Sequence, residues 1–392
     1  MKDWFIFFLK NKLLIAYGFL LNYFSSFGQT FFVSLFVPYW ISSFAITNVT
    51  FGSMYGAISV VSAFTLPFFG KYIDTLPLRI YSIIVLIGLL ISVIVMATAD
   101  VFFQLLSALF LLRLFGQGLM THTSSTGIAK LFEVNRGKAL AITSLGHPVA
   151  QFTLPLLVAA CGAFMNWRTI LIVMAALAFA VLMPLIVRVR EEDEFVKHRT
   201  RFRKEKGYSG FLKTKRFWII AVNIYIIPFL STAILLYQYL IAEGKGWDSS
   251  WVLFSFSFFA VSNGISLLLS GSLIDRFGGV KVFPYYLLPA LIGFLLMGML
   301  GDKWVFPLFY ALLGTSSGMG MTIKTAVQAE IYGTTNLGEV RSYLSMIMVL
   351  GTAAGPPFLG YFIDKGVTMD YIMLSAAAML IVTFLLSFKL KN

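Results

Sequence analysis

Cysteine and charged residues are scarce in this chain of 392 residues. Cys161 is the only cysteine, which excludes an intramolecular disulfide and a metal cluster built on cysteine. Only 12% of the residues are charged, against about 25% in soluble domains. With 59% hydrophobic residues, a compact body of this size would expose far more apolar surface than water tolerates. The composition therefore excludes a soluble protein, a disordered chain and a nucleic-acid-binding domain.

Long apolar runs take up most of the chain. A helix needs about 20 apolar residues to cross the hydrocarbon core of a bilayer. Because a backbone in lipid must satisfy its own hydrogen bonds, and because the runs are too long for barrel strands, we expect helices. The sequence predicts an all-α integral membrane protein with twelve spans: Leu13–Trp40, Phe51–Phe69, Ile80–Ala99, Val101–Ala129, Ala139–Ala163, Ile170–Val187, Phe217–Ala242, Trp251–Ile274, Val282–Leu300, Val305–Ala329, Ser342–Ile363 and Tyr371–Phe388.

The basic residues are distributed unevenly between these runs. The first run is too long for the core of a signal peptide, so we take it as a true span. With the amino terminus in the cytoplasm, the basic residues that fall on the outer side are Arg168, Lys245, Lys303 and Lys365, out of 30 in the chain. Cytoplasmic loops carry the excess of lysine and arginine in membrane proteins. We therefore expect a multi-pass protein of the cell (inner) membrane with both termini in the cytoplasm.

The two parts of the chain share an internal repeat. A polar, basic stretch at 188–216 separates residues 1–187 from residues 217–392 and is interpreted as a solvated cytoplasmic linker near anionic headgroups. A regulatory or nucleic-acid surface in this stretch is the less favoured alternative. A shift of 201 residues pairs several special residues at corresponding places: Gly70 with Gly271, Asp74 with Asp275, Asn135 with Asn336, Gly137 with Gly338, and Pro155 with Pro356. Two six-helix halves are therefore predicted.

The whole chain resembles the major facilitator superfamily, whose members carry the loop motif G-x-x-x-D-R-x-G-R-R/K after spans 2 and 8. The second copy here contains Gly271, Asp275, Arg276, Gly278 and Lys281, whereas the first keeps Gly70, Asp74 and Arg79 but loses the central arginine and the second glycine. The resemblance implies the major facilitator fold and a cytoplasmic gate at these residues. A carboxylate beside a helix amino terminus suits that role, with Asp74 near Gly338 and Asp275 near Gly137. Plain turns with polar caps are the alternative.

Three short segments resemble the organic-anion branch of this superfamily, which includes bacterial monocarboxylate and oxalate–formate porters. They are Ser26-Phe-Gly-Gln-Thr-Phe-Phe in the first run, Arg113-Leu-Phe-Gly-Gln-Gly in the fourth, and Asn135-Arg-Gly-Lys-Ala before the fifth. Substrates differ widely within that branch, so the resemblance implies a class of substrate rather than one compound.

Ionisable residues inside the predicted spans are the strongest functional candidates, because a charge in the membrane is costly. All 17 acidic residues fall in loops or at helix ends, yet Arg113 lies near the middle of the fourth run. A guanidinium stays charged and suits a carboxylate, so an anionic substrate is one partner for it, and helix-end carbonyls are the alternative. Further candidate substrate-binding residues are Gln29, Gln117, Lys324, Asn22, Tyr310, Gln151 and Asn263.

Coupling to a proton is a separate question. His147 lies in the fifth run with Gln151 one turn later, and histidine titrates near neutral pH. It is a candidate for proton coupling, although a neutral histidine that packs between helices is the commoner case.

No HExxH motif is present, and neither Gly137-Lys138 nor Gly244-Lys245 is preceded by the glycine-rich loop that binds phosphate. We expect neither an enzyme nor a cofactor or metal.

The sequence therefore predicts a secondary active or facilitative transporter that moves a small organic anion, plausibly a monocarboxylate, by alternating access. The expected partners are an anionic small molecule, the lipid bilayer and a coupling proton, with no nucleic acid, and the protein is expected to be monomeric. An exporter of larger amphipathic compounds, such as drugs or siderophores, is the alternative. A membrane enzyme or a sensor without transport activity is the least supported class.

Overall fold

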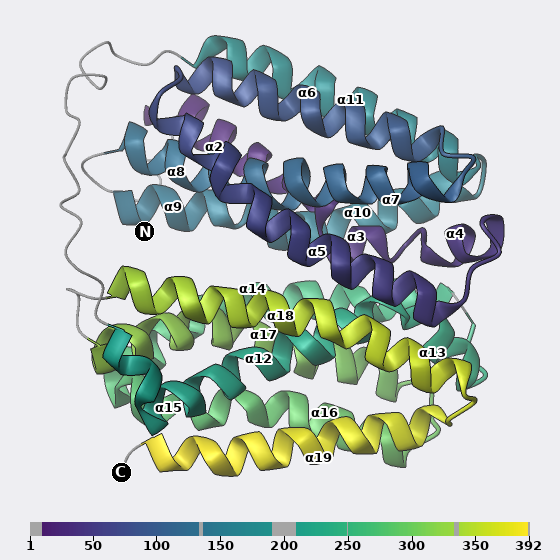
Figure 1. Ribbon diagram of the computed structural model, residues 1–392, viewed down its shortest axis with the longest axis vertical. Coiled ribbons are helices and arrows are strands. Elements are labelled where there is room, and N and C mark those ends of the chain that lie inside the picture. The colour runs from purple at the N-terminus through teal and green to yellow at the C-terminus, as the bar shows by residue number, and fades with distance from the viewer. Residues whose placement is uncertain (1–9, 133–135, 190–208, 249, 333–336, 391–392) are drawn as a thin grey trace. The chain divides into compact units, whose positions relative to one another are not determined.

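The computed structural model describes residues 10–132, 136–189, 209–248, 250–332 and 337–390, and within these ranges the chain is helical and contains no strand (Figure 1). The chain divides into two compact units. The first unit consists of Met1–Ala45 and Ile58–Phe202, and the second consists of Ile46–Ala57 and Arg203–Asn392. A short part of the amino-terminal sequence therefore packs with the carboxy-terminal half.

The helices of the first unit correspond to the first six predicted spans, several of which are divided into shorter pieces. Helix α5 contributes its later part to this unit. The elements are α2 (Lys12–Phe24), η1 (Ser25–Gly28), α3 (Thr30–Val33), α4 (Val37–Ser43), α5 (Asn48–Gly70), η2 (Lys71–Asp74), α6 (Leu78–Ala97), α7 (Phe102–Leu111), η3 (Leu112–Met120), α8 (Thr121–Leu131), α9 (Arg136–Ser144), α10 (Gly146–Gly162) and α11 (Trp167–Arg188).

The second unit contains the other six predicted spans and the start of α5. Its elements are η5 (Ser209–Lys213), α12 (Lys215–Leu236), α13 (Gln238–Gly244), α14 (Ser250–Phe277), α15 (Gly279–Val282), η6 (Pro284–Leu287), α16 (Leu288–Met299), α17 (Val305–Tyr332), α18 (Leu337–Asp364), α19 (Met369–Ser387) and η7 (Phe388–Leu390). Within this unit α14 packs along α17, and α12 packs along α18.

Ten helices in the described part of the chain are long and apolar enough to cross a membrane. Two predicted spans are not among them. The first run is broken between α2 and α4, so none of its pieces is long enough alone. Helix α17 has 28 residues, but glycine, serine and threonine make its sequence less apolar than the other long helices. Both predicted spans that differ from the structure contain small or polar residues, which are typical of places where membrane helices pack on one another.

The break in the first run coincides with two serine side chains that bond back to the backbone. The hydroxyl groups of Ser25 and Ser34 donate to backbone carbonyls three residues earlier, at 2.7 Å in both cases. Such bonds compete with the regular helical pattern. Between them, Gln29 adopts an extended conformation with φ −83° and ψ 151°. The hydrophobic run therefore does not form one straight helix.

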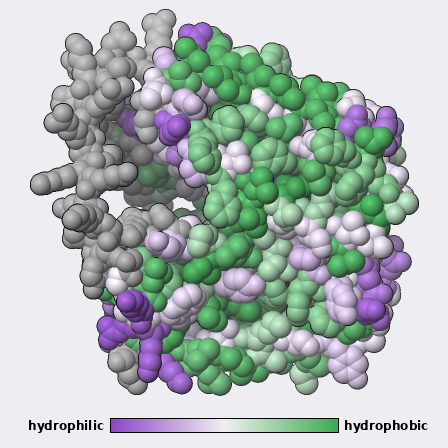
Figure 2. Space-filling model, viewed as in Figure 1, coloured by the Kyte–Doolittle hydropathy of each residue, from purple (hydrophilic) through white to green (hydrophobic). Residues whose placement is uncertain are grey.

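The outer surface is strongly apolar, as expected for a protein in a bilayer. Helix α6 shows this most clearly, because its exposed residues repeat with helical spacing along one side: Ile80, Ile84, Ile87, Ile91 and Ile94, each 45–50% exposed. Figure 2 shows hydrophobic side chains over much of the face that it presents. Lipid contact accounts for this exposure, which in water would promote aggregation.

Helix α5 begins at a carboxylate from another helix of the second unit. Asp364, at the end of α18, accepts hydrogen bonds from the Asn48 side-chain amide and from the Val49 backbone N–H, both at 2.9 Å. The Tyr237 hydroxyl donates to the Asn48 carbonyl at 2.6 Å. A carboxylate at this position satisfies unpaired backbone N–H groups and interacts favourably with the helix dipole.

Replacing Asp364 with alanine is expected to lower the thermal unfolding midpoint of the purified protein by a few degrees. Loss of an amino-terminal cap costs about 1 kcal/mol. Thermal unfolding in detergent, followed by the fluorescence of a thiol-reactive or tryptophan probe, measures the change. Glu243→Gln, which removes an exposed carboxylate of α13, is the matched control and should leave the midpoint unchanged. Equal midpoints for the two variants would contradict the assigned cap.

Candidate functional site

The break in the first span packs directly on an irregular segment of the fourth span. Residues Leu112–Met120 form a π-helix, and η1 packs against it. A Cβ atom at Gly28 would lie 2.2 Å from the Leu112 carbonyl oxygen and 2.4 Å from the Gln117 backbone nitrogen. A Cβ atom at Gly116 would lie 2.8 Å from the Gly28 nitrogen. Two glycines therefore permit the backbones to touch, at a π-helical segment of a kind frequent at functional sites.

Arg113 lies within this π-helical segment. Its side chain is buried, with 4% exposure, and its Nη1 donates to the Gly28 carbonyl oxygen at 3.3 Å. From the sequence, both a substrate and helix-end carbonyls were possible partners of this arginine. The structure shows a carbonyl contact, and that carbonyl belongs to the break in the first span. Arg113 thus positions the break and places a permanent positive charge beside it.

Helix α10 brings a histidine to the same break. The Ser26 hydroxyl lies 3.4 Å from His147 Nδ1, and the Phe31 ring meets the His147 ring edge-on with centroids 5.7 Å apart. One turn further along α10, Gln151 is 6% exposed, and its side-chain oxygen has no hydrogen-bond partner in the described part of the chain. A buried acceptor without a partner is uncommon and identifies Gln151 as a candidate for ligand contact.

The other predicted residues of the first unit have different surroundings. The Asn22 side-chain amide donates to the Thr143 carbonyl at 3.2 Å and thereby links α2 to α9. Gln29 and Gln117 are half-buried, and both lie at the contact between the break and the π-helix. The first unit therefore gathers Gln29, Arg113 and Gln117 around one backbone contact, with His147 adjoining it.

Lys324, the other candidate cation, lies in the second unit beside an aromatic ring. It lies on α17 with its ammonium nitrogen 5.3 Å from the centre of the Tyr286 ring, a cation–π arrangement. The Tyr286 hydroxyl in turn donates to the Asn223 side-chain oxygen, and the Asn223 amide donates to Ser387 at 2.7 Å. Hydrogen bonds that join η6, α12 and α19 therefore position the Tyr286 ring, and the ring in turn faces the lysine.

Tyr310 and Asn263 lie away from Lys324. Fourteen residues of α17 separate Tyr310 from Lys324, which is about 21 Å of helix. The buried Tyr310 hydroxyl donates to the Gln238 side-chain oxygen at 2.8 Å. Asn263 is 5% exposed on α14, and its carbonyl oxygen would lie 2.3 Å from a Cβ atom at Gly318. A small substrate at Lys324 would not reach Tyr310.

The second copy of the loop motif forms a compact turn. Gly278 has φ +82°, a left-handed conformation that favours glycine. Glu330 of α17 accepts a hydrogen bond from the Val280 N–H at 3.1 Å and so caps the start of α15. Among the other predicted gate residues, Gly271 has open space around it, Lys281 is exposed, and Arg276 lies over the Phe277 ring at 5.1 Å. The Asp275 side chain and its expected partner near Gly137 lie outside the described residues.

The first copy of the motif, which lacks the central arginine, is arranged differently. The Lys130 ammonium donates to the Ile73 carbonyl at 2.7 Å, which ties α8 to η2. A Cβ atom at Gly70 would lie 3.6 Å from His122 Nε2. Arg79 is exposed, and the Asp74 side chain and Gly338 lie outside the described residues. The pairing predicted between these two residues therefore stays a prediction.

Two residues near these loops were not among the predicted site residues. His122 is a second histidine inside a described span, in addition to His147. Glu330 was included only among the acidic residues at helix ends, and its role as a cap for Val280 is seen only in the structure. The close approach of Gly28 to the fourth span could not be read from the sequence at all.

Two kinds of catalytic arrangement were sought among the described residues. These residues contain no group of three or more histidine, cysteine or acidic side chains that could hold a metal. The Gly314–Gly318 run has the G-x-S-x-G spacing of a catalytic serine, but it lies inside α17, whereas the catalytic motif requires a strand-to-helix turn. The Ser316 hydroxyl accepts a hydrogen bond from the Ala290 N–H at 2.7 Å. This serine therefore serves helix packing.

Comparisons with known proteins agree with this architecture. Residues 19–281 and 238–392 match the Major Facilitator Superfamily profile. A multidrug resistance protein, MdtG, of Enterobacter lignolyticus (strain SCF1) is 22% identical over 333 residues, which cover 82% of this chain and 79% of that protein. A bacterial homologue of the human lysosomal transporter Spinster has the same fold in two crystal structures. The inward-facing, occupied form gives a TM-score of 0.73 with 15% identity over 97% of both chains. The inward-facing, unoccupied form gives 0.76 with 14% identity over 97% of this chain and 96% of that one. The chain therefore belongs to the major facilitator superfamily of membrane transporters.

Proposed function

We propose that the protein moves a small organic anion, such as a monocarboxylate, across the inner membrane by alternating access. One observation carries this proposal. Arg113 lies well inside a helix that can span the membrane, and Lys324 lies within the long helix α17, whereas every carboxylate of the described residues lies in a loop or in the first or last turn of a helix. A positive charge in the membrane needs a counter-charge, carbonyls or water. A carboxylate substrate supplies that counter-charge during each transport cycle.

The roles of the surrounding residues follow from their positions. Gln29 and Gln117 supply amide groups beside Arg113, and the buried oxygen of Gln151 accepts a hydrogen bond from a hydroxyl group or water that enters with the substrate. His147 is the candidate for proton coupling, because it lies beside the break and is the nearest titratable group there. A monomer of two halves, residues 1–187 and 217–392 joined by a cytoplasmic linker at 188–216, would perform the cycle.

The cytoplasmic gate is part of the same proposal. Asp74 and Asp275 would hold the cytoplasmic side closed by contacting the starts of the helices near Gly338 and Gly137. The capped turn at Gly278 supports this role for the second copy, because Glu330 fixes the loop that follows Asp275. The first copy lacks the equivalent arginine, so its contact would be the weaker one.

Transport by the protein in lipid vesicles tests the proposal. Radiolabelled acetate, lactate, oxalate and a neutral control sugar would be added to vesicles that contain purified protein. We expect saturable uptake of at least one carboxylate and none of the sugar. Lys324→Gln should raise the concentration needed for half-maximal uptake about tenfold or more, because it removes one charge-assisted contact.

Lys303→Gln is the matched control for that experiment. It also removes one positive charge, from a lysine in the loop between α16 and α17. The Lys303 ammonium lies 5.2 Å from the centre of the Trp251 ring. We expect its uptake to equal that of the unmodified protein. Absence of carboxylate flux in either direction, with the protein folded and correctly inserted, would overturn the proposed substrate class.

Export of amphipathic compounds is a second candidate function. The similarity to MdtG, which is named a multidrug resistance protein, favours it. At 22% identity this similarity supports a transporter of the same superfamily more strongly than a shared substrate. Growth of a deletion strain on a panel of drugs distinguishes the two functions. Increased sensitivity to several unrelated amphiphiles, together with normal carboxylate uptake, would favour export.

A further inference from the structure

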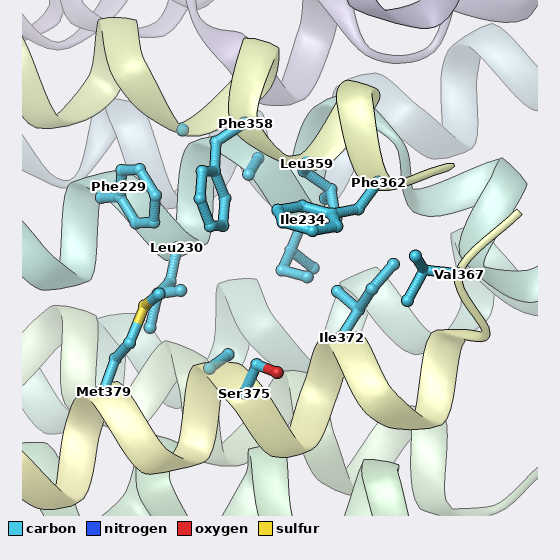
Figure 3. A pocket seen from close by; sticks show the side chains of 13 residues that line it. Phe229, Leu230, Ile234, Phe358, Leu359, Phe362, Val367, Ile372, Ser375 and Met379 are labelled. Carbon is cyan, nitrogen blue, oxygen red and sulfur yellow. The ribbon is translucent and has the colours of Figure 1, made fainter. Parts of the chain in front are cut away.

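An apolar cavity lies inside the second unit, between α12, α18 and α19. Its volume is about 240 Å³. Figure 3 shows Phe229, Phe358 and Phe362 along one side of the cavity and Ser375 and Met379 of α19 on the opposite side, all directed toward the space between the helices. Ser375 is the only residue with a polar side chain among those that line it. A cavity of about 150 Å³ with aliphatic and aromatic walls stays free of water and binds a small hydrocarbon.

The shape of the cavity follows from how α12 and α18 approach each other. A Cβ atom at Gly355 would lie only 2.1 Å from the Phe229 carbonyl oxygen, so the two backbones touch at one end of the space. Two consecutive prolines, Pro356 and Pro357, follow within α18 and supply no backbone N–H donors. Beyond this contact the aromatic rings fill only one wall: Phe229 and Phe358 have centroids 5.4 Å apart, and the space in front of them stays open.

The cavity reaches the surface of the protein, because side chains on both of its sides are exposed. Phe358 is 43% exposed, and Ser375 is exposed as well. In a membrane, the medium that meets such a side opening within the apolar part of a spanning helix is the acyl region of the bilayer. The occupant with direct access is therefore a hydrocarbon chain.

A lysine stands at the end of the same helix face. Phe358, Phe362 and Lys365 follow one another at helical spacings of four and three residues, so Lys365 lies about 10 Å along the helix from Phe358. Its ammonium nitrogen is 5.8 Å from the centre of the Tyr361 ring. Within the described ranges no carboxylate forms an ion pair with Lys365, whereas Lys245 is paired with Asp370. An apolar cavity below an unpaired cation matches a molecule with a hydrocarbon chain and an anionic head.

We propose that this cavity binds one acyl chain of an anionic membrane phospholipid, whose phosphate lies beside Lys365. The proposal goes beyond the transport function and does not depend on which substrate is carried. Tyrosine and lysine at this position are the residue types expected at the headgroup level of a bilayer. The bound lipid would fill the space between α18 and α19.

Photo-crosslinking tests this assignment. Phosphatidylglycerol with a diazirine on one acyl chain would be added to full-length protein in nanodiscs of zwitterionic phosphatidylethanolamine, and labelled peptides would be identified by mass spectrometry. We expect labelling concentrated on α18 and α19, reduced by unlabelled phosphatidylglycerol and much less by extra phosphatidylethanolamine. Ser375→Phe should reduce it at least fivefold by filling the cavity. Lys365→Gln should reduce it about fivefold, because it removes the charge-assisted contact between the ammonium and the lipid phosphate.

Matched variants separate a built site from general lipid contact. Ala180→Phe adds the same ring at an exposed position of α11, and Lys303→Gln removes a charge at another loop. Neither should change the labelling of α18 and α19. Labelling spread evenly over all exposed helices, or equal labelling in Lys365→Gln and Lys303→Gln, would overturn the proposal. So would competition by a transported amphiphile but not by phosphatidylglycerol, because the cavity would then hold substrate. Unchanged circular dichroism and unfolding midpoints confirm that each variant is folded.

Discussion

Replacing Arg113 with glutamine is expected to reduce organic-anion uptake by at least about thirtyfold. Removing one member of a buried pair of opposite charges costs about 2 kcal/mol or more. Arg113 carries a charge that no physiological pH removes, in a side chain that is only 4% exposed. The substrate carboxylate is the proposed counter-charge, so its binding should be the step affected. Uptake of radiolabelled carboxylate into proteoliposomes measures the loss.

A charge-conserving variant separates the two roles of Arg113. Arg113→Lys keeps the positive charge but cannot reproduce the planar fork that reaches the Gly28 carbonyl. We expect uptake between those of the unmodified protein and Arg113→Gln, with a lower unfolding midpoint. Arg168→Gln, at the loop where Arg168 pairs with Asp100, is the control and should transport normally. If glutamine and lysine reduce both uptake and stability equally, Arg113 supports only the fold and the proposed contact with substrate is wrong.

Replacing Gly28 with alanine is expected to cause a large loss of stability. The added Cβ would lie 2.2 Å from the Leu112 oxygen and 2.4 Å from the Gln117 nitrogen, and neither backbone atom can rotate away. Overpacking of this kind costs about 1–3 kcal/mol or more. We expect a markedly lower unfolding midpoint and little correctly folded protein in a fluorescence-detected size-exclusion profile.

Gly301→Ala provides the control, because nothing lies within 4 Å of its Cβ position. Gly116→Ala should resemble Gly28→Ala, since the two glycines face each other across the same contact. The effects of the double variant should be less than additive, because one displacement of the backbones relieves both clashes. An unchanged midpoint for Gly28→Ala would show that the first and fourth spans do not touch as described.

Much of the helical arrangement follows from the sequence, and its exceptions have physical reasons. Hydropathy locates helices such as α6 and α11 to within about three residues at each end, because lipid requires a continuous apolar stretch. Hydropathy does not distinguish a straight span from a broken one, so the interruption at Ser25 was not predicted. The hydroxyl groups that compete with the helix are small and hardly change the mean hydropathy of the run.

The candidate site was predictable in its residue types but not in their grouping. Arg113 and His147 were identified because charge and titratable groups are rare in spans. Their common neighbour, the break at Gly28, depends on a backbone contact between segments far apart in sequence. Tyr310 and Lys324 were both predicted to bind substrate, yet the Tyr310 hydroxyl donates to Gln238. Only tertiary packing decides which polar groups on a helix satisfy each other.

Two of the segments that carry the resemblance to organic-anion porters turn out to pack on each other. They are the stretch from Ser26 and the stretch from Arg113, which form η1 with its flanking residues and most of η3. Their glycines are explained by the close approach of the two backbones. That structural requirement offers an explanation for part of the similarity independently of the substrate, so the proposed substrate class depends on the buried charges and is to be tested by transport measurements.

Helix α5 has a consequence for the speed of transport. Its first part, up to Ala57, packs with the second unit, and the remainder packs with the first. A continuous helix resists bending, so a change between conformations must either deform α5 or release the contacts of its first part. Those contacts include the Asp364 cap and the close approach of Gly56 to the Ala353 carbonyl. We therefore expect the free energy of these contacts to contribute to the activation barrier of each transport cycle, and variants that weaken them to change the turnover number.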